Sequence, residues 1–166
     1  MSKNCARSLS AIILFAVLAS SALAQSPQPG DVPAAPVPTQ LVNAKRVFIA
    51  NGAGDNDPDI TRYTNGPDGV YNRFYADIKA LGRYEIVGSP SDADIALELR
   101  VEYALFNHTF SYPKFRVEVR DPKTNVLLWT FTEPVNGAFL AKTGRKNVAE
   151  SLLKLADDLK RIVPAQ

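Results

Sequence analysis

Apolar and polar residues alternate strictly along the middle of the chain. From Ile95 to Leu105 every second residue is apolar or aromatic, and charged residues stand between several of them. The same period of two recurs at Phe115–Arg120 and Val126–Glu133. Because successive side chains of a strand point to opposite faces, this pattern predicts three strands with one apolar face. The residues expected on that face are Ile95, Leu97, Leu99, Val101, Tyr103, Leu105, Phe115, Val117, Val119, Leu127, Trp129 and Phe131.

The opposite face of these strands is expected to be charged and wet. It would carry Thr130 and Thr132 and a set of acids and bases at alternate positions: Glu98, Arg100, Glu102, Arg116, Glu118 and Arg120. Such a face could dock a partner. We favour the plainer interpretation, in which cross-strand pairs of opposite charge stabilise a solvated sheet.

Two other segments have the period of an amphipathic helix. The first is expected from Pro67 or Asp68 to Leu81, and the second from about Gly144 to Val163. Gly82 should end the first helix in a left-handed conformation. Apolar residues repeat every three or four positions in both: Val70, Phe74, Ile78 and Leu81, then Val148, Leu152, Leu155, Leu159 and Ile162.

Short strands at 45–50 and 84–87 complete the predicted order of strand, helix, three or four strands, and helix. Two helices can cover only one face of such a sheet. The sequence therefore predicts an α/β (α+β) two-layer sandwich. Its sheet would be mixed, mostly antiparallel and of four to five strands, with both helices on one face.

The first 24 residues have the organisation of a secretory signal peptide. Lys3 and Arg7 precede the apolar run 11–19, and Ala22–Ala24 matches the small-x-small cleavage pattern. The run is shorter than the ~20 residues that span a bilayer. We expect a periplasmic or secreted protein with no stable membrane insertion after cleavage.

A Pro- and Ala-rich stretch, 25–43, follows the signal and is expected to be a flexible linker. The remaining residues, 44–166, have the length of a single α/β domain. Removal of the signal leaves 17 basic and 17 acidic residues. A neutral chain has no general attraction to nucleic acid, so no nucleic-acid partner is expected.

Cys5 is the only cysteine, and it precedes the apolar run of the signal. The mature chain would therefore lack a disulfide, a thiol nucleophile and a cysteine metal site. We found no cofactor motif and expect no cofactor.

One arrangement of motifs resembles a known group of proteins. The segments YNRFYADIK, GRYEIV, ADIALELR and FRVEVRDPKTNVLLWTFTE follow one another over roughly Lys45–Ile162. This progression is similar to bacterial envelope domains of the TolB amino-terminal, curli-assembly and outer-membrane-lipoprotein type. It resembles uncharacterised small secreted proteins even more. The resemblance implies an accessory or assembly role in the cell envelope. Many such relatives are lipoproteins, whereas this chain has no cysteine at the acylation position.

Aromatic residues cluster where the chain must turn between the first two long strands. Phe106, His108, Phe110 and Tyr112 lie within this turn region and are the candidate binding residues. Exposed aromatics suit recognition because they offer a large contact area at low rotamer cost. The alternative, equally compatible with the sequence, is that Phe106 and Tyr112 close the end of the core.

The loop at 55–59 places Asp55, Asp57 and Asp59 at alternate positions, as in loops that bind hard cations. Ile60 stands where a calcium loop has Gly, so these three residues are weak metal candidates and no metal site is expected. A small hydrolase that combines these carboxylates with His108 is an alternative, as is a calcium-responsive domain.

We therefore expect a non-enzymatic binding or assembly module, with no catalytic residues. Its partner would be another envelope protein, a glycan or a second copy of the chain.

Overall fold

The computed structural model describes residues 35–52, 63–64, 68–106, 110–138 and 140–162, and at 104–106 and 110–112 it describes the backbone alone. A compact unit begins at Pro36. The predicted signal peptide and most of the predicted linker lie outside the described residues, so both stay predictions.

Five strands form one mixed sheet in the order β2-β1-β3-β4-β5. The inner strand β1 is parallel to β2 and β3, whereas β3, β4 and β5 form longer antiparallel ladders. This confirms the predicted mixed sheet. The strands are β1 (Arg46–Asn51), β2 (Glu85–Ile86), β3 (Ile95–Phe106), β4 (Phe110–Arg120) and β5 (Leu127–Pro134).

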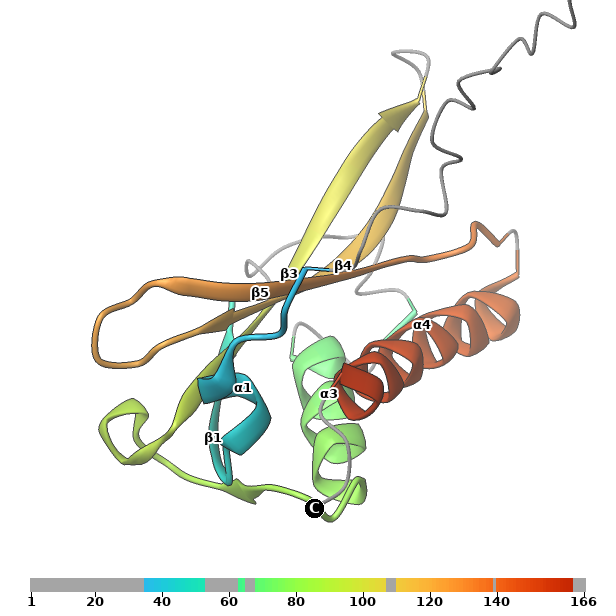
Figure 1. Ribbon diagram of the computed structural model, residues 1–166. Coiled ribbons are helices and arrows are strands. Elements are labelled where there is room, and N and C mark those ends of the chain that lie inside the picture. The colour runs from blue at the N-terminus through green and yellow to red at the C-terminus, as the bar shows by residue number, and fades with distance from the viewer. Residues whose placement is uncertain (1–34, 53–62, 65–67, 107–109, 139, 163–166) are drawn as a thin grey trace, which may run out of the picture. The chain divides into compact units, whose positions relative to one another are not determined.

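Two long helices form the second layer. α3 (Gly69–Ala80) and α4 (Ala141–Ile162) pack against each other beside the sheet (Figure 1). Gly82 has a φ of 63°, and its N–H donates to the carbonyl of Lys79 over 3.1 Å, as expected for a left-handed helix end. A one-turn helix, η1 (Pro90–Asp92), leads into β3.

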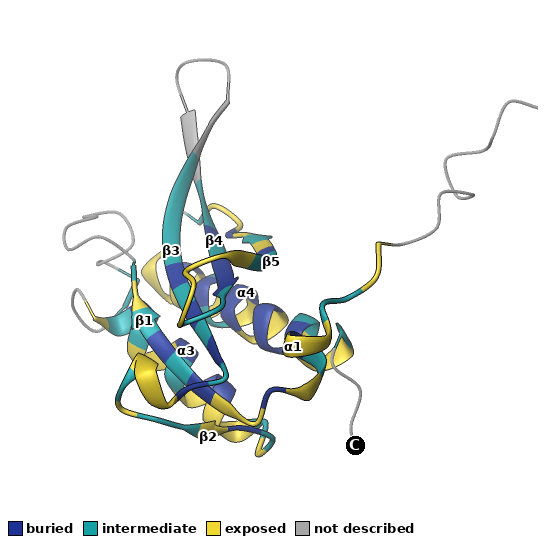
Figure 2. Ribbon diagram, turned by 60° about the vertical axis from the view of Figure 1, so that its left-hand side comes forward, coloured by how far each residue is buried: buried dark blue, intermediate teal, exposed yellow. Residues whose placement is uncertain are grey.

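The core lies between the sheet and the helices (Figure 2). Alternate residues are buried along Ile95–Leu99 of β3 and at 115, 117 and 119 of β4, which confirms the period-two prediction there. Glu118 of the outer face is buried as well. On α4 the predicted apolar stripe is buried from Val148 to Leu159. The inward residues of the two central strands are Ile95, Leu97, Leu99, Phe115, Val117 and Val119, each at most 2% exposed.

The prediction for β5 is wrong at its first residue. Leu127 was expected to face the core, but it is 44% exposed. A β-bulge causes this, because Val119 pairs with Trp129 while the next residue, Arg120, pairs with Leu127. Leu128 is the extra residue, and it packs partly against the core. Beyond the bulge, Trp129 packs against the core and Phe131 is buried, as predicted.

The folded chain also begins earlier than predicted. Thr39–Asn43, assigned above to the linker, forms the short helix α1, and Leu41 is fully buried in the core. The connection from α1 into β1 is fixed by Asp94. Its carboxylate accepts the backbone N–H groups of Lys45 and Arg46 over 3.0 and 2.8 Å. These residues therefore belong to the domain.

Candidate binding surface

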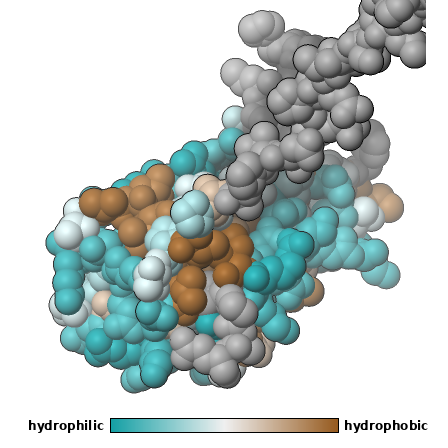
Figure 3. Space-filling model, viewed as in Figure 1, coloured by the Kyte–Doolittle hydropathy of each residue, from teal (hydrophilic) through white to brown (hydrophobic). Residues whose placement is uncertain are grey.

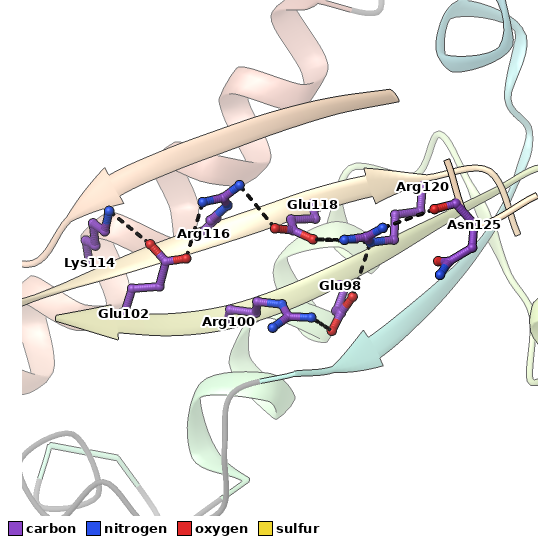
Figure 4. A network of polar contacts seen from close by, with 8 residues as sticks. All are labelled: Glu98, Arg100, Glu102, Lys114, Arg116, Glu118, Arg120 and Asn125. Carbon is purple, nitrogen blue, oxygen red and sulfur yellow. Dashed lines mark hydrogen bonds and ion pairs between the residues drawn. The ribbon is translucent and has the colours of Figure 1, made fainter. Parts of the chain in front are cut away.

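The outer face of the β3–β4 ladder carries seven charged side chains, which we call the charged grid (Figure 4). Each one alternates with residues that face the core, so the whole set lies opposite the helices. The grid consists of Glu98, Arg100 and Glu102 from β3, and Lys114, Arg116, Glu118 and Arg120 from β4.

The register of the two strands places like charges opposite each other. Glu98 pairs with Glu118, and Arg100 pairs with Arg116. Only Glu102 and Lys114 form a directly opposed pair of unlike charge. Like charges directly opposite destabilise a sheet. The expected cross-strand pairs of opposite charge are present, but only one of them joins directly opposed residues.

The charges are neutralised along the strands and along diagonals instead (Figure 4). Across the strands, Arg116 Nη1 lies 3.4 Å from Glu102 Oε1, and Arg120 Nε lies 3.5 Å from Glu98 Oε2. Along β4, Arg116 Nη2 lies 3.1 Å from Glu118 Oε1. Each carboxylate thus contacts two cations.

Glu118 is the most buried member of the charged grid. Its side chain is 9% exposed, against 32% for Arg116 and 25% for Arg120. Arg120 donates to Glu118 Oε2 from both Nε and Nη2, which is a charge-assisted contact of the stronger kind. Nη1 of Arg120 also donates to the carbonyl of Asn125, in the turn before β5, over 3.1 Å. The central carboxylate is therefore a structural group that holds two arginines in place.

Arg100 has the most exposed side chain of the four cations in the charged grid. Its guanidinium forms an ion pair with Glu98 through Nη2, and its side chain remains 43% exposed. The Nε–H groups of Arg100 and Arg116 are buried and have no hydrogen-bond partner among the described residues. The grid contains four cations and three carboxylates, so one positive charge is in excess. The sequence alone did not show that Arg100 and Arg116 are opposite each other. It placed both on the outer face, but the alignment of β3 with β4 was unknown.

The β3–β4 hairpin extends past the strands on either side of it. β1 pairs with β3 only as far as Leu99, and β5 pairs with β4 only as far as Lys114. From Tyr103 and Pro113 onward, β3 and β4 pair with each other alone, out to Phe106 and Phe110. We call residues 103–106 and 110–113 the arm, and it projects from the body of the protein (Figure 1).

Three of the four predicted binding residues lie on the strands of the arm. Phe106 pairs with Phe110, and Tyr112 pairs with Ala104. His108 lies outside the described residues. At the base of the arm, the hydrogen bond from Lys114 and the charges of Lys114 and Arg116 lower the pKa of Glu102. The charged grid therefore reaches the point where the arm leaves the sheet, and Glu102 is ionised there at neutral pH.

The weak metal candidates Asp55, Asp57 and Asp59 lie outside the described residues, so the calcium and hydrolase alternatives remain untested. Within the described ranges, no group of three His, Cys, Asp or Glu residues is arranged to hold a metal ion. The helices in those ranges are too short or too polar to cross a bilayer.

A hollow of about 620 Å³ is lined by residues from the start of β1 and from the ends of α3 and α4. Carbonyl ends of helices carry partial negative charge, which nearby cations balance. Lys160, in the last turn of α4, is placed to balance this partial charge. The lining residues are Ala44, Lys45, Leu81, Gly82, Arg83, Glu85 and Lys160.

Among the residues whose side chains are described, large exposed apolar groups are found at three separate places. Val126 and Leu127 lie at the turn into β5, Leu140 precedes α4, and Leu153 lies on the solvent side of α4. The view in Figure 3 shows apolar groups within a surface that is otherwise hydrophilic. Isolated apolar residues of this kind are normal on soluble domains, so they do not by themselves mark a site.

Comparison with known proteins gives structural likeness alone. No family model matches the chain, and no curated protein matches it. A PelC variant from Paraburkholderia phytofirmans, which forms a dodecamer, is 18% identical with a TM-score of 0.40. It covers 68% of this chain and 86% of its own.

Two further solved structures show the same level of likeness. A DUF330 protein from Xanthomonas campestris is 11% identical with a TM-score of 0.46, covering 77% of this chain and 85% of its own. A minor lipoprotein from Acinetobacter baumannii is 14% identical with a TM-score of 0.32, covering 70% and 90%. All three of these neighbours are bacterial proteins. At such identities and TM-scores they establish neither a family nor an activity.

Proposed function

We propose that this chain is a non-enzymatic binding or assembly module of the bacterial cell envelope. The arm and the charged grid at its base would form the binding surface. The arm carries this proposal, because residues 103–106 and 110–113 form a two-stranded ribbon that pairs with no other strand of the sheet.

A ribbon of two strands is only marginally stable in water, since it has no second layer to bury its apolar residues. The arm nevertheless contains Leu105 and three large aromatics, Phe106, Phe110 and Tyr112. Aromatic residues are enriched at the centre of protein interfaces, and tyrosine is enriched among the residues that dominate their binding energy. An aromatic ribbon outside the core gains stability when a partner covers it, and recognition would explain why the chain has one.

The exported protein, immobilised and incubated with envelope extract, tests this proposal. We expect it to retain a defined protein, a glycan or a second copy of itself. The variant Phe106→Ser, Phe110→Ser, Tyr112→Ser should lose that partner. Because these residues lie on strand segments that pair with neither β1 nor β5, the variant should keep the urea midpoint of the parent to within about 0.5 M, a small shift on the usual scale of denaturant sensitivity.

A matched control removes apolar surface elsewhere. The variant Val126→Ser, Leu127→Ser changes two exposed residues at the turn into β5 and should retain the partner. Retention of the same partner by the arm variant would overturn the proposal, and so would a parent protein that retains nothing.

A further inference from the structure

We propose that Arg100 and Arg116 form a binding site for a carboxylate of the partner, supplied by an acidic side chain of an extended peptide segment. This inference rests on the proposed function, because it names the chemistry of the partner that the arm would bind. It goes further in placing a specific site on the face that we first interpreted as a simple solvated sheet.

The first argument is the arrangement of charge. Arg100 and Arg116 are directly opposite each other across the β3–β4 ladder. Every other directly opposed position in the grid includes a carboxylate. Like charges at directly opposed positions destabilise a ladder, and an added anion at this position would reduce that cost. With four cations to three carboxylates, the charged grid has room for one more negative group, and this pair is where it would be accommodated.

The second argument is that the two arginines have hydrogen-bond donors without acceptors. Both Nε–H groups are buried without a partner among the described residues, and such groups destabilise the state in which they occur. A guanidinium binds a carboxylate best through two parallel N–H bonds, and one favourable geometry uses Nε and an Nη group together. Arg100 is 43% exposed and contacts Glu98 through Nη2, so it can turn toward an incoming carboxylate. Binding would then satisfy a donor that the free protein leaves unsatisfied.

The third argument concerns the rest of the partner. Side chains on one face of an extended peptide recur every two residues, which is also the spacing of charges along β3 and β4. Lys114 lies two residues from Arg116, at the base of the arm. A peptide with acidic residues at alternate positions could therefore place one carboxylate at the arginine pair and the next near Lys114. The first would neutralise the excess charge, and the second would share Lys114 with Glu102, as Glu102 and Glu118 already share Arg116. This match in spacing favours a peptide over an acidic polysaccharide, whose carboxylates are not spaced by a strand repeat.

The probe is capped tetraglutamate, titrated at low salt into the exported protein labelled with nitrogen-15, because exposed charges are screened at high ionic strength. The Nε–Hε signals of Arg100 and Arg116 should shift together and saturate. Capped tetraglutamine should leave them unchanged. Arg100→Gln should weaken binding about tenfold, as expected for the loss of a bidentate charged contact.

Two further variants separate geometry from charge. Arg100→Lys keeps the charge but loses the planar fork, so it should bind with intermediate strength. Arg145→Gln, an exposed position on α4, removes the same charge on the helical side and should bind like the parent. Equal shifts at every arginine, unsaturable binding, or unchanged binding by Arg100→Gln would overturn the site. Tighter binding of a glucuronate oligomer would overturn the choice of a peptide.

The two proposals fail in different ways. Loss of the captured partner in the arm variant, without saturable binding of tetraglutamate, would contradict the carboxylate site alone. Saturable binding at Arg100 with undiminished capture by the arm variant would contradict the role of the arm alone.

Discussion

Replacement of Glu118 by Gln is the perturbation that most directly probes the charged grid. Glu118 is the central carboxylate, with a side chain that is 9% exposed and contacts to Arg116 and Arg120. Glutamine has nearly the same shape, so the change removes charge with little effect on packing. Arg116 and Arg120 would then each lose one of their two anionic partners.

The size of the effect follows from the burial of the partners. Breaking a buried ion pair costs about 3–5 kcal/mol when the remaining charge stays buried. Arg116 and Arg120 are 32% and 25% exposed, so water can partly solvate them after the change. We therefore expect Glu118→Gln to lower the free energy of unfolding by about 2 kcal/mol. The control Glu98→Gln, at a carboxylate that is 23% exposed, should lower it by about 1 kcal/mol.

Urea unfolding followed by the fluorescence of Trp129, the single tryptophan, measures both variants. With a denaturant dependence of about 2 kcal/mol per M, the expected loss at Glu118 corresponds to a midpoint about 1 M lower. Addition of 1 M salt should reduce the effect of Glu98→Gln more than that of Glu118→Gln, because exposed charges are screened more strongly. If Glu118→Gln shifts the midpoint no more than Glu98→Gln does, burial is not what makes Glu118 important and the reasoning is refuted.

Three other changes have defined outcomes. Leu41→Ala should lower the free energy of unfolding by about 2–4 kcal/mol in urea, because the side chain is fully buried; a loss below about 1 kcal/mol would show that α1 is dispensable. The pKa of Asp94 is lowered below 3.8, most of all by the hydrogen bond from the backbone N–H of Arg46. The contribution of Asp94 to the free energy of unfolding is therefore present above pH 3.8 and is lost as the pH falls through the lowered pKa. Asp94→Asn should be less stable than the parent at neutral pH and lose less on acidification, and identical acid unfolding curves would contradict this. Burial, and then the charge of Asp158, raises the pKa of Glu133 above 4.5, which disfavours its ionised form in the native state. Glu133→Gln should therefore be more stable by a few tenths of a kcal/mol at pH 7, after allowance for solvent screening, and melting curves should show the gain disappearing below pH 4.5.

The sequence predicted the elements whose periodicity extends over many residues. Alternation along Ile95–Phe106 identified the full length of β3, and the apolar stripe of α4 identified its buried face. Such patterns repeat a local rule many times, so individual exceptions do not obscure them. α1 was missed because five residues contain little more than one helical turn. Its single fully buried residue, Leu41, cannot reveal a period in a Pro-rich context.

The remaining errors arose from register, which alternation does not determine. The β-bulge opposite Val119 and Arg120 adds one residue to β5, so Leu127 changes face while Trp129 does not. Six of the seven charges of the grid were recognised from their parity on each strand, and Lys114 was not. Which charge stands opposite which depends on how β3 and β4 are aligned, and this places Arg100 against Arg116. The candidate carboxylate site is therefore a property of pairing that only the structure reveals.

The central claim is that the arm binds a partner. Site-specific photocrosslinking in intact cells tests it most directly. A photoreactive residue would replace Phe110 on the arm, or Leu153 on the solvent side of α4 as the control, and adducts formed in intact cells would be identified by mass spectrometry. We predict a discrete adduct from position 110 that is absent from position 153. No adduct from position 110, or the same adducts from both positions, would contradict the account.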